Sequence, residues 1–239
     1  MSRYLIFGAT SGIGAAIADD VLERGEELIA VGRNQEALDR LATRGANIET
    51  RDLSRSDDRV ELWKRLSAGP FEVDRVVFAS GVALRGKPGE LEPEGLRQMF
   101  EVNTLTALEL IDWSMRLTPG SVVTLFSSNL AQNPLPNTVG YSASKAAVEA
   151  AMRASATTLA GKGIRLNCIA PGPVDTPMLR GQFADDDSAD AGVAALASFG
   201  PLGRIGEVSD VVEALRYIEG AAWLTGQVLT LDGGFSCPA

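Results

Sequence analysis

Short apolar runs alternate with stretches of helical spacing along almost the whole chain. The apolar runs are continuous, which is typical of strands that are covered on both faces. They predict strands at residues 4–8, 28–31, 46–50, 73–79, 121–127, 165–170 and 227–231. The stretches between them predict helices at residues 13–24, 35–42, 57–66, 96–116, 141–160 and 208–218. This alternation predicts an α/β fold, a doubly wound parallel sheet of about seven strands in a single domain over residues 1–239.

One segment, residues 179–200, breaks this rhythm. It is acidic at first and rich in alanine later. We interpret it as a lid over a pocket, while an ordinary surface loop followed by a helix fits the same pattern.

Composition and charge exclude several classes of protein. The chain has 239 residues, and its 22 Lys and Arg against 31 Asp and Glu give a formal net charge of −9, so we expect no nucleic acid partner. It has no histidine, which excludes a Ser-His-Asp triad, and two cysteines, Cys168 and Cys237, cannot complete a four-ligand metal cluster. We therefore expect no metal. No apolar run reaches the roughly 18 residues of a membrane span, and the few cysteines favour a reducing, cytoplasmic location.

A glycine-rich turn, Gly8-Ala9-Thr10-Ser11-Gly12-Ile13-Gly14, follows the first predicted strand and opens a helix. Glycine lets a diphosphate approach the backbone closely, and the free N–H groups of the helix N-terminus attract anions. Three glycines alone are a weak signal, because a tight strand-to-helix turn also needs them. The strand before and the helix after favour a dinucleotide site.

The end of the second predicted strand reads Val31-Gly32-Arg33-Asn34, without an acidic residue. In dinucleotide sites a carboxylate at this place binds the ribose 2′-hydroxyl, whereas an arginine accepts a 2′-phosphate. Arg33 therefore predicts that NADP(H) is preferred over NAD(H). The alternative is a solvated arginine that merely precedes a helix.

Tyr141 and Lys145 lie four residues apart and share one face of the predicted helix 141–160. Such a pair is usually no more than two surface neighbours. Together with other motifs in the same order, however, it resembles the YxxxK of the short-chain dehydrogenase/reductase family. Ser128 lies 13 residues before Tyr141, which is the family's spacing.

Further motifs extend this resemblance from Gly8 to Gly234. The glycine-rich turn resembles the family's TGxxxGIG, Asp52-Leu53 resembles the acid–apolar pair that contacts adenine, and Asn103 resembles the family's helix asparagine. The later motifs are Pro171-Gly172-Pro173-Val174-Asp175-Thr176, Leu224-Thr225-Gly226 and Asp232-Gly233-Gly234. Two positions depart from the pattern: Phe7 stands where the family has Thr, and Phe78-Ala79-Ser80-Gly81 stands where it has Asn-Asn-Ala-Gly.

The resemblance implies a Rossmann-like fold and an NADP(H)-dependent oxidoreductase that interconverts a carbonyl and an alcohol by hydride transfer. The catalytic residues that it implies are Asn103, Ser128, Tyr141 and Lys145. The expected cofactor-binding residues are Gly8, Thr10, Ser11, Gly12, Ile13, Gly14, Arg33, Asn34, Asp52, Leu53, Ala79, Ser80, Gly81, Tyr141, Lys145, Pro171, Gly172, Val174 and Thr176. It also implies that Lys145 holds the nicotinamide ribose and that Asn103 anchors a water leading to Lys145.

The chemistry of the pair follows from magnitudes. A free tyrosine has a pKa near 10, so only about one in a thousand is ionised at pH 7. An ammonium group about 4 Å away supplies roughly 4 kcal/mol at an effective dielectric near 20, enough to lower that pKa by about three units. We therefore expect Lys145 to lower the pKa of Tyr141. Tyr141 would then act as acid or base while Ser128 binds the substrate oxygen.

The substrate pocket is expected at the carboxyl ends of the strands. Its predicted lining is Leu130, Gln132, Leu135, Met178, Leu179 and Phe183. These mostly apolar residues suit a neutral or apolar carbonyl compound. An acyl-carrier protein is a less favoured substrate, because such carriers are acidic like this chain, although scattered basic residues such as Lys162 leave that option open.

Two other functions fit the same motifs. One is a catalytically silent NADP(H)-binding sensor or scaffold protein, and the other is an isomerase or lyase on the same fold. The resemblance also implies a homo-oligomer, a tetramer or dimer, whose interface could come from the last strand and the helix of Tyr141.

Overall fold

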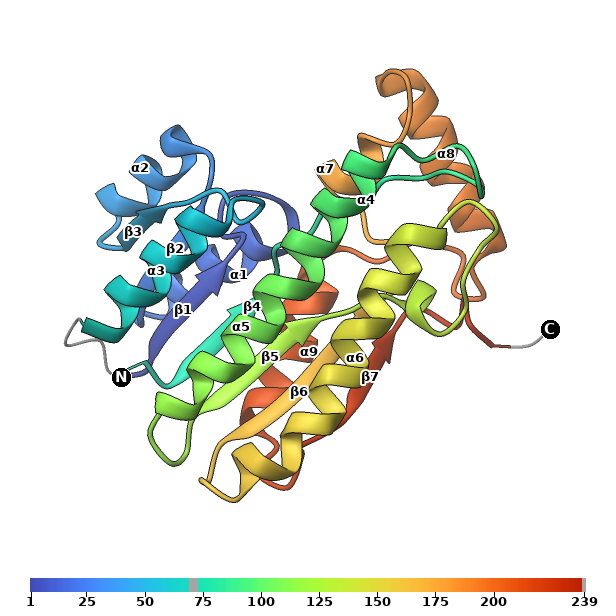
Figure 1. Ribbon diagram of the computed structural model, residues 1–239. Helices are drawn as coiled ribbons and strands as arrows, with labels where there is room; N and C mark the ends of the chain where they lie inside the picture. The colour runs from blue at the N-terminus through green and yellow to red at the C-terminus, as the bar shows by residue number, and fades with distance from the viewer. Residues whose placement is uncertain (69–72, 238–239) are drawn as a thin grey trace.

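A parallel sheet forms the centre of the molecule, and the computed structural model describes residues 1–68 and 73–237. Within these residues the sheet has seven strands in the order β3-β2-β1-β4-β5-β6-β7, all parallel (Figure 1). The strands are β1 Arg3–Phe7, β2 Glu27–Gly32, β3 Asn47–Thr50, β4 Arg75–Phe78, β5 Val122–Phe126, β6 Arg165–Pro171 and β7 Val228–Leu231. The predicted fold class is confirmed.

Helices cover both faces of the sheet. Successive side chains of a strand point to opposite faces, so Tyr4 and Ile6 pack against one helical layer and Leu5 and Phe7 against the other. The first layer holds α1 Gly12–Glu23, α2 Gln35–Thr43 and α9 Val208–Gly220. The second holds α3 Ser56–Ala68, α5 Thr106–Trp113 and α6 Val139–Ala160. Burial on both faces explains the continuous apolar runs.

The helix predicted at residues 96–116 is a continuous helical stretch that changes from α-helix to π-helix, back to α-helix and finally to 3₁₀-helix. It starts earlier, with α4 Pro93–Phe100, and Pro93 suits the first turn because its missing N–H is not needed there. A π-helical turn, Glu101–Leu105, joins α4 to α5, and a short 3₁₀ turn, Ser114–Arg116, ends the stretch. Asn103 lies in the π-helical turn, a feature that often marks functional sites.

The segment 179–200 contains the end of α7 Pro177–Arg180 and the whole of α8 Asp186–Phe199. Asp185 caps α8: its carboxylate accepts the Ser188 N–H, and the Ser188 hydroxyl accepts the Asp185 N–H. The acidic start of the segment therefore lies at the end of a helix dipole that favours negative charge. Figure 1 shows α8 projecting beyond the sheet, at the end to which the strands point.

The order of the strands reverses beside β1, which has β2 on one side and β4 on the other. Chains leaving β1 and β4 therefore diverge and leave a crevice at their carboxyl ends, where open α/β sheets bind ligands. Among the described residues, no helix is long and apolar enough to cross a membrane, and no three potential metal-ligating side chains come together.

Candidate active site

Two adjoining pockets open at this carboxyl edge. One is lined by the glycine-rich turn and the ends of β2, β3 and β4, and the other by the residues after β5 and the start of α6. The residues common to both are Ile13, Ala79, Gly81, Thr176 and Met178. A ligand bound across this shared wall would reach both pockets, as an extended dinucleotide must.

The glycine-rich turn is built for close backbone approach. Gly8 has a φ of +81°, and a Cβ at Gly14 would lie 2.2 Å from the Gly8 carbonyl oxygen. Ser11 precedes α1 as its N-cap, but its side chain makes no capping hydrogen bond. The N–H groups of the first turn of α1 thus keep their capacity to bind an anion, which fits the diphosphate of a dinucleotide.

Two arginines line the same pocket where β2 and β3 end. Arg33 lines it as the sequence predicts, and Arg51 joins it because β2 and β3 end side by side, with Gly32 paired to Thr50. The Arg51 Nε atom is buried without a hydrogen-bond partner in the described structure. Sequence reasoning missed Arg51, although neighbouring parallel strands bring the residues after each strand together and could have indicated it.

Asp52 and Asn34 lie next to these arginines. Asp52 lines the pocket, and although partial burial acts the other way, hydrogen bonds from Ser54 and the charges of Arg33 and Arg55 lower the pKa of its carboxyl. Asn34 has a different task, since its side-chain oxygen accepts the Ala37 N–H at 3.0 Å and caps α2. Asn34 is not among the described residues that line either pocket.

Of the other predicted cofactor-binding residues, most line one of the two pockets. The glycine-rich turn's Gly8, Thr10, Ser11, Gly12 and Ile13 do so together with Leu53, Ala79, Ser80, Gly81, Pro171, Gly172, Val174 and Thr176. Gly14 instead packs beneath the turn.

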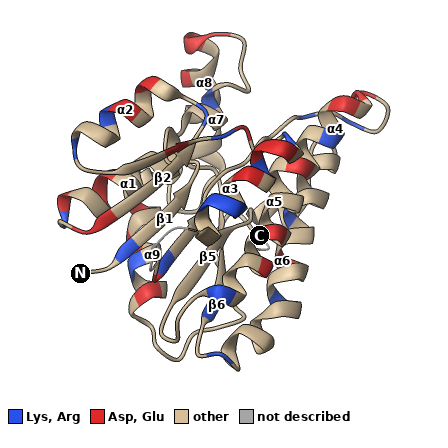
Figure 2. Ribbon diagram, turned by 60° about the vertical axis from the view of Figure 1, so that its left-hand side comes forward, with Lys and Arg blue, Asp and Glu red and all other residues tan. Residues whose placement is uncertain are grey.

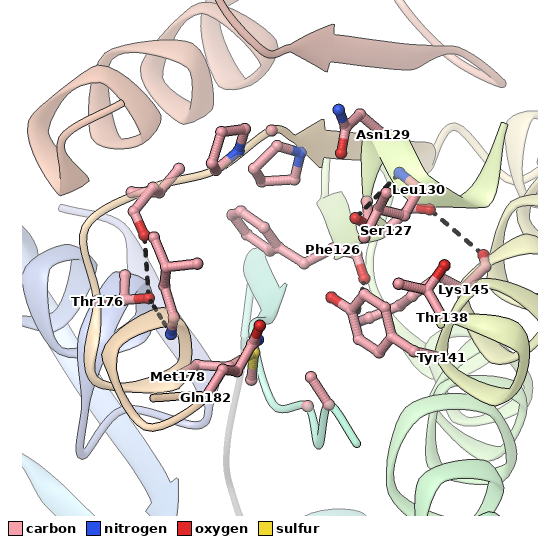
Figure 3. Close-up of a pocket in the computed structure, with 18 of the residues that line it drawn as sticks. Phe126, Ser127, Asn129, Leu130, Thr138, Tyr141, Lys145, Thr176, Met178 and Gln182 are labelled. Carbon is pink, nitrogen blue, oxygen red and sulfur yellow. Dashed lines mark hydrogen bonds between the residues drawn. The ribbon is translucent and has the colours of Figure 1, made fainter. Parts of the chain in front are cut away.

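Tyr141, Ser128 and Lys145 all line the second pocket, and Figure 3 shows Tyr141 and Lys145 side by side on one of its walls. Ser128 follows β5 and accepts the Leu130 N–H at 3.2 Å, whereas Tyr141 and Lys145 come from successive turns of α6. Lys145 Nζ donates to the Phe126 carbonyl oxygen at 2.9 Å and lies 5.9 Å from the centroid of the Tyr141 ring. Figure 3 shows the Tyr141 ring directed into the pocket, facing the segment of Thr176 and Met178.

The electrostatics of this pair differ from the sequence-based expectation. Burial raises the pKa of Tyr141, while the neighbouring Ser128 hydroxyl and the positive charge of Arg85 act in the opposite direction. Burial also lowers the pKa of Lys145 to about 8. The expected lowering of the Tyr141 pKa by Lys145 is therefore wrong for this structure, because desolvation dominates and the ammonium is hydrogen-bonded to Phe126.

Asn103 is buried next to the site, where it links two segments that line the pockets, but it is not among the lining residues of either pocket. Its side-chain oxygen accepts the Val82 N–H at 2.8 Å, and its amide nitrogen donates to the Val82 carbonyl and the Ser144 hydroxyl, both at 2.9 Å. The Ser144 hydroxyl in turn donates to the Tyr141 carbonyl at 2.7 Å. The side chain of Asn103 thus ties the segment after β4 to the turn of α6 that carries Tyr141.

The substrate side of the pocket is mostly apolar, with a volume of about 320 Å³ that suits a small molecule. Leu130, Leu135, Met178 and Leu179 line it as predicted. Gln132 and Phe183 are not among its described lining, which corrects two predictions. The Gln132 amide instead donates to the Glu149 carboxylate. The Phe183 ring packs against Gly192, where an added Cβ would lie 2.2 Å from the ring.

Sequence reasoning also missed lining residues from other parts of the chain. Leu84 and Arg85 come from the segment after β4, Leu196 comes from α8, and Phe235 comes from the C-terminal segment. Leu196 lies within the predicted lid and Phe235 directly follows Asp232-Gly233-Gly234. No motif includes Leu84 or Arg85, so no local pattern indicates that these two residues line the pocket.

The two departures from the family pattern lie next to each other. Phe7 and Phe78 are partners across β1 and β4, with ring centroids 5.7 Å apart, and the Trp63 ring lies 5.6 Å from Phe7. Phe7 and Phe78 belong to the core on one face of the sheet, and the partly buried Trp63 packs against it. Aromatic packing thus occupies the place of the family's Thr and Asn.

Comparison with known proteins places the chain in a family. Residues 8–236 match the family model described as enoyl-(acyl carrier protein) reductase. The chain is 31% identical over 246 residues to cis-4-hydroxycyclohexanecarboxylate dehydrogenase of Sinomonas cyclohexanicum, which covers 97% of this chain and 95% of that protein. It is 30% identical over 250 residues to L-xylulose reductase of Caenorhabditis elegans, covering 98% and 95%.

A solved structure agrees. A variant of actinorhodin polyketide ketoreductase with NADPH is 26% identical and has a TM-score of 0.88, covering 99% of this chain and 98% of that one. Fold and matches together define the class of nicotinamide-dependent oxidoreductases built on one Rossmann-like domain. Within that class the chain belongs to the short-chain dehydrogenase/reductase family. It is an enzyme of this family that acts on CH–OH groups.

Proposed function

We propose that this enzyme interconverts a carbonyl and an alcohol with NADP(H), and that Tyr141 is the catalytic acid and base. The observation that carries the proposal is the convergence of Tyr141, Ser128 and Lys145 in an apolar pocket that shares a wall with the glycine-rich pocket. The raised pKa of Tyr141 keeps its hydroxyl protonated at neutral pH, as an acid for carbonyl reduction requires.

The roles of the chain's residues follow from their positions. The Tyr141 hydroxyl would give its proton to the substrate oxygen, and the Ser128 hydroxyl would donate a hydrogen bond to that oxygen and orient it. Lys145, fixed by the Phe126 carbonyl, would hold the ribose beside the pocket. Asn103 would hold the Tyr141 turn in place through Ser144. The nicotinamide supplies or accepts the hydride when it is bound.

The preference for NADP(H) is part of this proposal. Arg33 and Arg51 lie at one end of the glycine-rich pocket, where two guanidinium groups would bind a 2′-phosphate better than one. Asp52 beside them accepts hydrogen bonds from the N–H and the hydroxyl of Ser54, both on Oδ1.

The test is a panel of carbonyl and alcohol compounds assayed with NADPH and with NADH, followed by the change in absorbance of the reduced cofactor. We expect turnover with a clear preference for NADPH. Binding of NADPH without turnover of any compound would favour the sensor or scaffold alternative, which the similarity to named dehydrogenases and reductases does not favour. Product analysis separates a redox reaction from isomerisation or elimination.

We propose that residues 179–200 act as a lid on the substrate pocket. Leu179 from α7, Gln182 from the turn after it and Leu196 from α8 line that pocket. Helix α8 projects from the sheet and has few buried residues. Arg180 joins the two helices, because its guanidinium pairs with Asp175 before α7 and with Asp190 on α8. Protection of α8 from hydrogen exchange should rise when NADPH and a substrate analogue bind together.

We also propose a homo-oligomer, a tetramer or dimer. Phe100, Leu105 and Leu108 are exposed along the α4–α5 stretch, and Trp223 is fully exposed before the edge strand β7. Exposed apolar residues on these two parts of the surface suit symmetric interfaces. Light scattering of the purified protein should give a mass of two or four chains.

A reducing, cytoplasmic location is the last part of the proposal. Both cysteines are free, with Cys168 buried and Cys237 exposed. An exposed thiol is stable where disulfides do not form. Cell fractionation with a tagged chain tests it.

A further inference from the structure

Arg85 contributes a positive charge to the wall of the substrate pocket. It lines the pocket together with Ser128 and Tyr141 and is itself exposed, which puts it where the pocket meets solvent. Its charge reaches the reacting group, since it acts to lower the pKa of Tyr141. No Asp or Glu is among the described residues that line this pocket, and its other cation, Lys145, is held by the Phe126 carbonyl.

The backbone next to Arg85 is fixed against the start of the catalytic helix. The Gly86 N–H donates to the Asn137 carbonyl at 2.8 Å, and Gly86 forms an isolated parallel bridge with Thr138, three residues before Tyr141. Gly86 is buried, and a Cβ there would lie 2.7 Å from Leu91. The backbone that carries Arg85 is therefore anchored next to the start of the helix that carries Tyr141.

Arg85 is also unusual among the arginines of this acidic chain. Within residues 1–68 and 73–237, the arginines without a salt bridge or hydrogen bond are Arg33, Arg85 and Arg116. Figure 2 shows Asp and Glu spread over many helices, with Lys and Arg between them, so partners are plentiful. Two of these three arginines line the two pockets, and the third, Arg116, lies in the turn before β5 at the opposite edge of the sheet.

We propose that Arg85 binds a carboxylate of the substrate, and that the substrate is a hydroxy acid or oxo acid whose carboxylate is separated from the reacting carbon by a carbon chain or ring. The apolar side chains of Leu84, Leu130 and Leu135 would contact that chain or ring while the reacting oxygen lies between Tyr141 and Ser128. A guanidinium group matches a carboxylate in two parallel hydrogen bonds. This substrate class replaces the neutral compound expected from the sequence, and it rests on the proposed oxidoreductase function.

The experiment compares oxo acids with their methyl esters as substrates. Wild-type protein, Arg85→Met, Arg85→Lys and the control Arg116→Met are each assayed with NADPH on 4-oxopentanoate, 5-oxohexanoate and 6-oxoheptanoate and on the three esters. We expect wild-type kcat/KM to favour at least one acid over its ester by tenfold or more. Arg85→Met should lower kcat/KM for that acid by about 10- to 100-fold, mainly through KM, and leave the ester within about threefold. Arg85→Lys should restore part of the loss, and Arg116→Met should change nothing.

Two outcomes overturn the proposal while leaving the oxidoreductase function intact. One is a wild-type enzyme that reduces the esters or other neutral carbonyls as well as the acids. The other is an equal loss on acid and ester in Arg85→Met, which would assign Arg85 to the ionisation of Tyr141 alone. If the wild type reduces no carbonyl compound at all, the function itself fails.

Discussion

Burial changes the charge properties of individual side chains in this site, and Lys145 is the clearest case. Its side chain is buried with a pKa lowered to about 8, so folding desolvates an ammonium group and recovers one hydrogen bond, to the Phe126 carbonyl. Placing a charge where water is excluded costs stability. A buried ammonium group that lowers stability in this way is consistent with the role in ribose binding that we propose for Lys145.

Replacing Lys145 by Met should therefore stabilise the protein while it abolishes activity. From an ordinary pKa of 10.5 to about 8, burial of the charge costs about 3 kcal/mol below pH 8, so we expect Lys145→Met to raise the free energy of unfolding by about 1–3 kcal/mol at pH 7. Between pH 8 and 10.5 the unfolded chain binds more protons at this group, so wild-type stability rises with pH and the difference shrinks.

Urea unfolding at pH 7 and pH 9.5 measures this effect. Lys162→Met is the matched control, because Lys162 also donates to a backbone carbonyl, that of Met115, but is exposed. A destabilised Lys145→Met, or a difference that does not depend on pH, would contradict the interpretation.

The second prediction at this scale concerns the cofactor. Arg33→Ala and Arg51→Ala should each raise the Kd for NADPH by about 10- to 100-fold and change the Kd for NADH by less than about threefold, because each would remove a charged hydrogen bond to the 2′-phosphate that we propose these arginines bind. Fluorescence titration with both cofactors checks this, with Arg55→Ala as a control nearby whose side chain pairs weakly with Asp58. Equal weakening of both cofactors, or a wild type that prefers NADH, would refute the cofactor assignment.

The pairing of elements shows what a sequence can predict and what it cannot. The spacing of apolar residues predicts where buried strands and helices lie and that they alternate along the chain. The seven strands and most helices are therefore predicted within a few residues of their observed bounds. The π-helical turn at Glu101–Leu105 is not predictable in this way, because a single extra residue in a helical turn hardly changes the apolar spacing. Arg51 and Arg85 were missed for a related reason: each acquires its neighbours through sheet register or a distant bridge, not through a motif.

The packing of β1 against β4 carries a prediction of its own. Since Phe7 and Phe78 replace the family's polar pair at partnered positions, either single change back, Phe7→Thr or Phe78→Asn, should destabilise the protein by about 3–5 kcal/mol through a cavity and an unpaired polar group. The double variant should lose at least about 1 kcal/mol less than the sum of the two, because Thr and Asn can then pair.

Denaturant unfolding of the four proteins completes this cycle. Phe7→Thr combined with Phe126→Asn is the control, since Phe126 belongs to the core on the other face of the sheet, and here we expect additive losses. Additive losses for Phe7 and Phe78 as well would show that the two departures are independent.

At the scale of the whole molecule, the fold brings two adjoining pockets to one edge of the sheet. The reversal of strand order beside β1 places the glycine-rich turn, Arg33 and Arg51 in one pocket, and Tyr141, Ser128, Lys145 and Arg85 in the next. With a net charge of −9, the chain repels anions at long range, so anionic ligands depend on local cations. We propose that Arg33, Arg51 and Arg85 are such cations, and binding of NADPH and of oxo acids should then weaken together as salt is raised.

The claim on which all of this depends is that the Tyr141 hydroxyl transfers the proton. The direct measurement is the turnover and the NADPH affinity of Tyr141→Phe, with Tyr217→Phe, a change at an exposed tyrosine, as the control. The account predicts at least a 1000-fold loss of kcat for Tyr141→Phe, an NADPH Kd within about twofold of the wild type, and an unchanged control. Turnover that survives in Tyr141→Phe would contradict it.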